Sequence, residues 1–165
     1  MAFPATSAPL AQALLEREYH EPTPVQTAVL EANASGRDLL VSAQTGSGKT
    51  VAFGLAISDT LLEGAEKFTT FGDPVALVIA PTRELALQVQ TELVWLYQHT
   101  GARVIACVGG MDPKRERRRL GDGAHIIVGT PGRLRDHLER GVLDIANLKA
   151  VVLDEADEML DLGFR

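Results

Sequence analysis

Short apolar runs alternate with longer amphipathic stretches along most of this chain. The apolar runs lie at residues 38–43, 75–80, 103–108, 125–130 and 150–153. Each run is continuously apolar, which is typical of strands buried on both faces of a parallel sheet. The stretches between them have helical spacing and lie at residues 49–64, 83–100, 112–121 and 131–141. This order predicts an α/β fold, with a parallel sheet flanked by helices on both faces.

The segment before the first run predicts two short helices between Ala8 and Ala34. Pro22 and Pro24 separate them, because proline interrupts helical hydrogen bonding. In the first helix, Leu10, Leu14 and Leu15 are expected to share one apolar face. We therefore divide the chain into N-terminal helices at 1–36 and a core at 37–165.

Composition limits the class of protein. The chain has 165 residues, 45% of them hydrophobic, which suits a single domain with a buried core. No apolar run is long enough to span a membrane, and the start "MAFPATSAPL" lacks the regions of a signal peptide. The single cysteine, Cys107, lies in the apolar run "VIACV", so we expect a core residue. These features favour a cytoplasmic protein.

Charge is unevenly distributed. The formal net charge is −6, yet "KRERRR" at 114–119 holds five of the sixteen basic residues. This run is either the solvated face of a helix or a local patch that faces phosphates.

A glycine-rich loop, "SAQTGSGKT", lies between the first apolar run and a helix. Glycines let phosphate oxygens approach the backbone, and the amides of the following helix supply positive potential. We expect phosphate contacts from Thr45, Gly46, Ser47, Gly48 and Lys49. Thr50 offers a hydroxyl to Mg²⁺. Ala43 stands where the strict motif begins with glycine. The expected ligand is a nucleoside triphosphate with Mg²⁺.

Two adjacent carboxylates follow the last apolar run. Asp154 comes directly after "VVL", at the end of a strand where open parallel sheets bind ligands. We expect Asp154 to hold Mg²⁺, directly or through water, and Glu155 to orient or deprotonate an attacking water.

Six segments in order resemble the first RecA-like domain of DEAD-box RNA helicases. They are "EPTPVQ" (21–26), "AQTGSGKT" (43–50), "PTRELALQ" (81–88), "GG" (109–110), "TPGRL" (130–134) and "DEAD" (154–157). The resemblance implies an ATP-binding domain in which Gln26 reads adenine, Thr23 supports it and Tyr19 stacks on the base. It implies catalytic roles for Lys49, Asp154 and Glu155.

The same resemblance implies contacts with the sugar-phosphate backbone of RNA, without readout of its sequence. The matching residues are Pro81, Thr82, Arg83, Gly109, Gly110, Thr130, Pro131, Gly132 and Arg133. Taken without the family, "PTRE" predicts only a helix start with Thr82 as its N-cap.

Three departures from the family pattern stand out. Glu18 occupies a position where the family usually has glycine, and Phe3 is the only candidate for an upstream aromatic residue. The sequence ends at "LDLGFR", so we expect the last strands of the sheet, a Ser-Ala-Thr segment and a second RecA-like domain with an arginine finger to be absent from it.

The resulting expectation is the ATP- and RNA-binding half of an RNA helicase, which hydrolyses ATP poorly by itself. One alternative is a catalytically silent nucleotide-binding module. The other is a different P-loop enzyme, such as a DNA helicase or a kinase, which Gln26 and the sequence Ala156-Asp157 disfavour.

Overall fold

A computed structural model describes residues 8–155 of the chain, apart from positions 20, 25, 28–47, 64, 66, 69–71 and 111. The strand predicted at 38–43 and most of the second predicted helix lie outside these residues. Within them, no helix is long and apolar enough to cross a bilayer. The chain divides into two compact units, and each has its own arrangement.

The first unit contains helix α1 (Ala8–Glu16), helix α3 (Lys49–Leu62) and the end of helix α4 (Arg83–Leu96). In α1, Leu10 and Leu14 are buried, whereas Leu15 is 62% exposed. The prediction that Leu15 shares their face was wrong. Leu10 and Leu14 are four residues apart and lie on one side of the helix, but Leu15 is turned by about 100° from Leu14.

Close contact between α3 and the end of α4 forms the core of this unit. Leu93, Leu96 and Tyr97 are fully buried. Gly54 makes the contact possible, because a Cβ atom there would lie 2.7 Å from Cδ2 of Leu96. The Tyr97 hydroxyl donates a hydrogen bond to the Gly54 carbonyl, so the polar end of this buried ring is satisfied.

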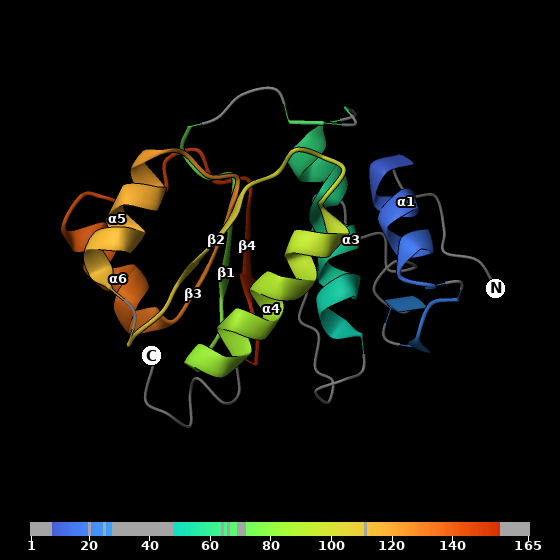
Figure 1. Cartoon of the computed structure of the whole chain (residues 1–165), viewed down its shortest axis with the longest axis horizontal. Coiled ribbons are helices and arrows are strands. Elements are labelled where there is room, and N and C mark those ends of the chain that lie inside the picture. Colours follow the sequence, from blue (N-terminus) through green and yellow to red (C-terminus); the bar gives the residue numbers. More distant parts are fainter. Residues whose placement is uncertain are drawn as a thin grey trace. The chain divides into compact units, whose positions relative to one another are not determined.

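The second unit contains a parallel sheet of four strands in the order β2-β3-β1-β4. The strands are β1 (Ala76–Ile79), β2 (Val104–Cys107), β3 (Ile126–Gly129) and β4 (Ala150–Leu153). Their last residues are paired in register, Cys107 with Gly129, Gly129 with Ile79, and Ile79 with Leu153. The carboxyl ends of all four strands therefore lie at one edge of the sheet (Figure 1).

Helices cover both faces of this sheet, as the sequence predicted. Helices α5 (Pro113–Gly121) and α6 (Pro131–Glu139) lie on one side, and the beginning of α4 lies on the other (Figure 1). The core beneath α5 and α6 includes Leu77, Ile105, Cys107, Ile127 and Leu134. Burial and the nearby Glu116 raise the pKa of the Cys107 thiol to about 12, so the thiol stays neutral as a core residue.

Strand β4 differs from the expectation of burial on both faces. Val151 and Leu153 are 56% and 57% exposed. Their register partners in β1 are Leu77 and Ile79, which do pack in or against the core beneath α5 and α6. Among the described residues, the helices that cover this face therefore leave Val151 and Leu153 exposed, which the apolar pattern of one strand cannot reveal.

The junction between β3 and α6 predicts a strong effect of one methyl group. A Cβ atom on Gly129 would lie 2.6 Å from the Cys107 carbonyl oxygen and 2.7 Å from Cδ2 of Leu134. We expect Gly129→Ala to lower the free energy of unfolding by about 1–3 kcal/mol, as overpacking does. Urea unfolding followed by circular dichroism measures this change.

Gly132→Ala is the matched control. No atom lies within 4 Å of a Cβ atom built on Gly132, which is exposed on α6. Alanine favours a helix over glycine by up to about 1 kcal/mol, so this variant should be neutral or slightly more stable. Equal unfolding midpoints for the two variants would contradict the close packing at Gly129.

Candidate functional site

The carboxyl edge of the sheet gathers four of the predicted motifs. Just beyond the last paired residues, three more backbone hydrogen bonds of 2.8–3.1 Å join neighbouring strands. They run from the amides of Thr130, Ala80 and Asp154 to the carbonyls of Cys107, Gly129 and Ile79, respectively. In the strand order β2-β3-β1-β4, the segments that follow the strands are "GG", "TPGR", "PTR" and the first two residues of "DEAD", Asp154 and Glu155. Segments that are far apart in the chain thus form one continuous row.

The acidic end of this row holds the two predicted carboxylates. Asp154 is 2% exposed, directly after β4. Glu155 has a φ of 53°, the left-handed conformation that residues with a Cβ atom rarely adopt. Such backbone strain is often found at functional sites, because the surrounding structure must hold it in place. It marks Glu155 independently of its motif.

Two helix beginnings lie at the middle of the row. At the start of α4, the Thr82 hydroxyl accepts a hydrogen bond of 3.3 Å from the Leu85 amide, so the N-cap role predicted without the family is confirmed. At the start of α6, Thr130 is the N-cap but its side chain makes no capping bond, and Pro131 occupies the first turn. The amides of both first turns contribute positive potential at this edge.

Arg83 and the paired glycines meet at this edge. A Cβ atom on Gly110 would lie only 2.7 Å from Nη1 of Arg83. Gly110 has a φ of 83°, which favours glycine. The exposed guanidinium therefore lies directly against the "GG" turn, and two of the predicted phosphate-contacting segments form one surface.

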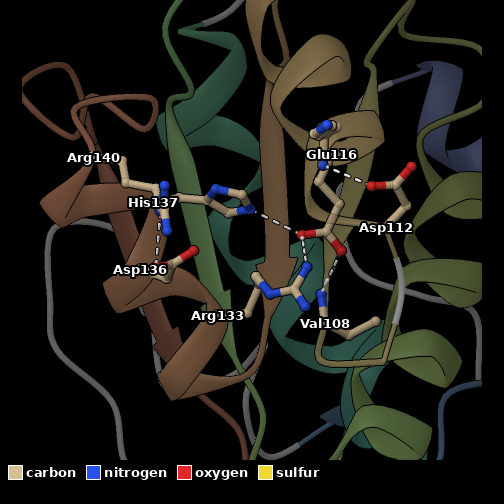
Figure 2. Close-up of polar contacts among 8 residues, drawn as sticks. Val108, Asp112, Glu116, Arg133, Asp136, His137 and Arg140 are labelled. Carbon is tan, nitrogen blue, oxygen red and sulfur yellow. Dashed lines mark hydrogen bonds and ion pairs between the residues drawn. The ribbon is translucent and has the colours of Figure 1, made fainter.

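Arg133, by contrast, is largely buried. Its side chain is 13% exposed, and Nη1 donates to Oε1 of Glu116 at 2.9 Å (Figure 2). Glu116 also accepts from the Val108 amide and bonds to His137. The sequence did not predict these contacts. The available signal was that Glu116 is the single acid within "KRERRR".

The first unit holds the residues predicted to bind the nucleotide. Gln26 is fully buried; Oε1 accepts from the Thr23 amide at 2.9 Å and Nε2 donates to the Gly48 carbonyl at 3.2 Å. Gly48 has a φ of 85°, and a Cβ atom there would lie 2.4 Å from Nε2 of Gln26. The predicted adenine-reading segment thus packs against the end of the phosphate loop.

Lys49 and Thr50 open helix α3, as predicted. Both are nearly buried, at 9% exposure. Thr45, Gly46 and Ser47 lie outside the described residues. Because Lys49 and Thr50 belong to the first unit and Asp154 and Glu155 to the second, each pair is placed only within its own unit.

Tyr19 follows a tight end of α1. Its amide donates to Leu14 and the Glu18 amide to Leu15, a pattern that ends many helices and places the residue before Tyr19 in the left-handed region. Glu18 has a φ of 60° there, so this chain forms with glutamate a turn that glycine adopts more easily. The Tyr19 ring packs against Trp95, with 5.4 Å between centroids, and its stacking on adenine remains a prediction.

Comparison with known proteins identifies the family. The sequence model of the DEAD/DEAH box helicase family matches residues 23–165. The chain belongs to this family. It is 45% identical to the DEAD-box ATP-dependent RNA helicase CshA of Bacillus cereus over 156 residues, 94% of this chain and 28% of CshA. It is 46% identical to the ATP-dependent RNA helicase DeaD of Escherichia coli K12 over 158 residues, 95% of this chain and 24% of DeaD.

Solved structures confirm the fold. The chain matches the yeast DEAD-box splicing factor Prp28 with a TM-score of 0.81 and 36% identity, over 92% of this chain and 36% of that one. It matches the RNA helicase Prp28 from Chaetomium thermophilum, solved bound to ADP, with a TM-score of 0.84 and 40% identity, over 96% of this chain and 39% of that one. The predicted RecA-like α/β fold is confirmed. The chain spans about a quarter of the length of the curated relatives.

The contact between Gly48 and Gln26 predicts a nucleotide-binding defect. In Gly48→Ala, a left-handed conformation that costs about 1–2 kcal/mol for an L-residue is combined with a collision with Gln26. We expect ADP affinity, measured by isothermal titration calorimetry, to fall at least about tenfold. Gly121→Ala, at the open end of α5, is the control and should bind ADP normally. Normal ADP binding by Gly48→Ala would contradict the assignment of this loop.

Proposed function

We propose that this chain is the ATP-binding and RNA-contacting part of a DEAD-box RNA helicase, which couples ATP hydrolysis to local unwinding of RNA duplexes. The observation that carries the proposal is the row of "GG", "TPGR", "PTR" and the carboxylates Asp154 and Glu155 at one sheet edge. A row that runs from amides and an exposed arginine to two carboxylates can link a phosphate backbone at one end to nucleotide chemistry at the other. The names of CshA and DeaD support the same activity.

For the nucleotide, Gln26 selects adenine while it also holds the phosphate loop. Among the described residues, the side-chain amide of Gln26 uses one lone pair for Thr23 and one hydrogen for Gly48. A second lone pair and a second hydrogen therefore remain available to a ligand. The ADP titration described above, repeated with GDP, tests this choice: equal affinities would exclude it.

In this proposal, Thr50 and Asp154 each supply an oxygen ligand to Mg²⁺. A hydroxyl at a helix start and a buried carboxylate at a strand end are ligands of the kind this ion prefers. When bound, the ion would neutralise charge on the nucleotide phosphates. Lys49 contributes a further positive charge to the phosphates, and Glu155 orients the attacking water and accepts its proton.

For RNA, the described residues of this edge offer hydrogen-bond donors to phosphates, and in this proposal they contact the backbone without reading bases. The sugar-phosphate backbone is bound, whatever the base sequence, by Arg83, the glycine amides and the helix starts at Pro81–Arg83 and Thr130–Arg133. With a net charge of −6, the chain should bind RNA weakly and depend strongly on salt.

Hydrolysis requires a second RecA-like domain, in this proposal, because an arginine finger from across the cleft contributes about 10³–10⁵ in rate. The 165-residue chain alone therefore binds nucleotide and hydrolyses it poorly.

We also propose a cytoplasmic location, where the buried Cys107 thiol would stay reduced.

If Arg83 contacts a phosphate, it should contribute to the salt dependence of RNA binding. Affinity for single-stranded RNA, measured by fluorescence anisotropy, should fall linearly with salt on logarithmic axes. Arg83→Gln should weaken binding and reduce the magnitude of the slope by about 0.7, the share of one phosphate contact. Arg135→Gln is the control, because Arg135 is 81% exposed on α6 and paired with Glu139. An unchanged slope in Arg83→Gln would contradict a phosphate contact at this residue.

If Glu155 activates the attacking water, its substitution should affect ATP hydrolysis but not ATP binding. In a version of the chain that includes a second RecA-like domain, Glu155→Gln should bind ATP normally and lose RNA-stimulated phosphate release by at least about a hundredfold. Lys49→Ala should instead weaken ATP binding, because it removes a phosphate contact. Hydrolysis by Glu155→Gln at the native rate would exclude Glu155 as the residue that activates water.

A further inference from the structure

Helix α5 buries the one carboxylate of a strongly basic segment. The five cations at 114, 115, 117, 118 and 119 point outward or lie partly exposed, and none has an ion-pair partner in the described part of the chain. Glu116 points inward, with its side chain 5% exposed. Burial of an ionised carboxylate is costly unless donors surround it, so its partners explain its position.

Three donors from two segments, the residue that follows β2 and helix α6, surround this carboxylate (Figure 2). Oε2 accepts from the Val108 amide at 3.1 Å. Oε1 accepts from Nη1 of Arg133 at 2.9 Å and lies 2.9 Å from Nε2 of His137, which is fully buried. With its hydrogen on Nε2, the His137 ring donates the third bond. Among the described residues, Nδ1 of His137 has no hydrogen-bond partner.

The segments that meet at Glu116 carry proposed RNA contacts. Val108 immediately precedes the "GG" turn, and Arg133 is the last residue of "TPGR". Strands β2 and β3 bring these segments side by side, but the strand ladder ends at Cys107 and Gly129. Beyond the ladder, Glu116 connects the start of the glycine turn to the first turns of α6.

A metal site is the other reading of this cluster. Atoms of Cys107, Glu116 and His137 that could ligate a metal lie within 4.8 Å of one another. Two observations disfavour it. The guanidinium of Arg133 already contacts the carboxylate oxygen, and burial raises the pKa of the Cys107 thiol to about 12, whereas metal binding requires a thiolate.

We propose that Glu116 is a positioning residue, which holds the "GG" turn and the start of α6 at the spacing needed to bind successive RNA phosphates. Arg133 then acts through Glu116 rather than on a phosphate, because its charge is paired and its side chain largely buried. This inference rests on the proposed RNA-binding function.

The first test compares Glu116→Gln with the native 165-residue chain. Binding of a short fluorescein-labelled oligouridylate should weaken about fivefold, the effect of losing one hydrogen bond, while ADP affinity stays unchanged. Glu139→Gln is the matched control, because Glu139 also accepts from an arginine of α6 but is 62% exposed. Native RNA affinity in Glu116→Gln would overturn the inference. If the native chain bound no RNA, the proposed function itself would fail first.

The second test separates the two arginines by salt dependence. Arg133→Gln should weaken RNA binding without changing the salt slope, whereas Arg83→Gln should reduce it by about 0.7. The double variant E116Q/R133Q should lose no more affinity than the weaker-binding single variant, since both disrupt one interaction. Equal slope changes at Arg83 and Arg133 would make Arg133 a phosphate contact and overturn its assigned role.

The third test measures directly whether Glu116 holds the start of the "GG" turn in place. Amide hydrogen exchange of Val108 should become faster in Glu116→Gln, whereas exchange of Ile127, within the central strand β3, should stay slow. If Glu116→Gln does not fold, E116Q/R133Q removes both buried charges and serves for the same measurements. Faster exchange at Val108 with unchanged RNA affinity would show a merely structural role and overturn the proposal.

Discussion

The parallel register of the sheet is the constraint on which this molecule depends. Cys107, Gly129, Ile79 and Leu153 are paired across the sheet as the last residues of their strands. In a parallel sheet every strand ends at the same edge, so whatever follows these residues is gathered there. Residues far apart in the chain, such as Ile79 and Leu153, become neighbours, and the order of the strands alone decides which motif adjoins which.

Charge at that edge is arranged locally, against the net charge of the chain. The chain is acidic overall, yet Arg83 and the helix starts present positive potential where the proposed RNA contacts lie. Burial of Glu116 contributes in two ways. The carboxylate neutralises Arg133 inside the structure, and its removal from the surface of α5 leaves the cations of this helix without an acidic neighbour at that position. This separation of charges requires that the buried carboxylate of Glu116 has enough hydrogen-bond donors around it.

Close approach of backbone and side chain sets the geometry of the first unit. Gly48 leaves room for the buried amide of Gln26, and Gly54 leaves room for Leu96. At Glu18 the chain adopts a left-handed turn without glycine. A preference for glycine is thus strict where a Cβ atom would collide with a neighbour. It is weaker where the only cost is an unfavourable backbone angle.

The sequence by itself determined the fold class, four of the predicted strands and the helices between them, because continuous apolar runs and helical periodicity are local properties. It also determined the candidate residues, since the motifs are local spacings of chemically distinctive side chains. Only the tertiary structure decided that Leu15 and the outer face of β4 are exposed, that Tyr19 packs on Trp95, and that Glu116 is buried with Arg133 and His137. These outcomes depend on which segments meet across long sequence separations. A charged residue within a charged run carries no local sign that a partner in another helix will draw it into the core.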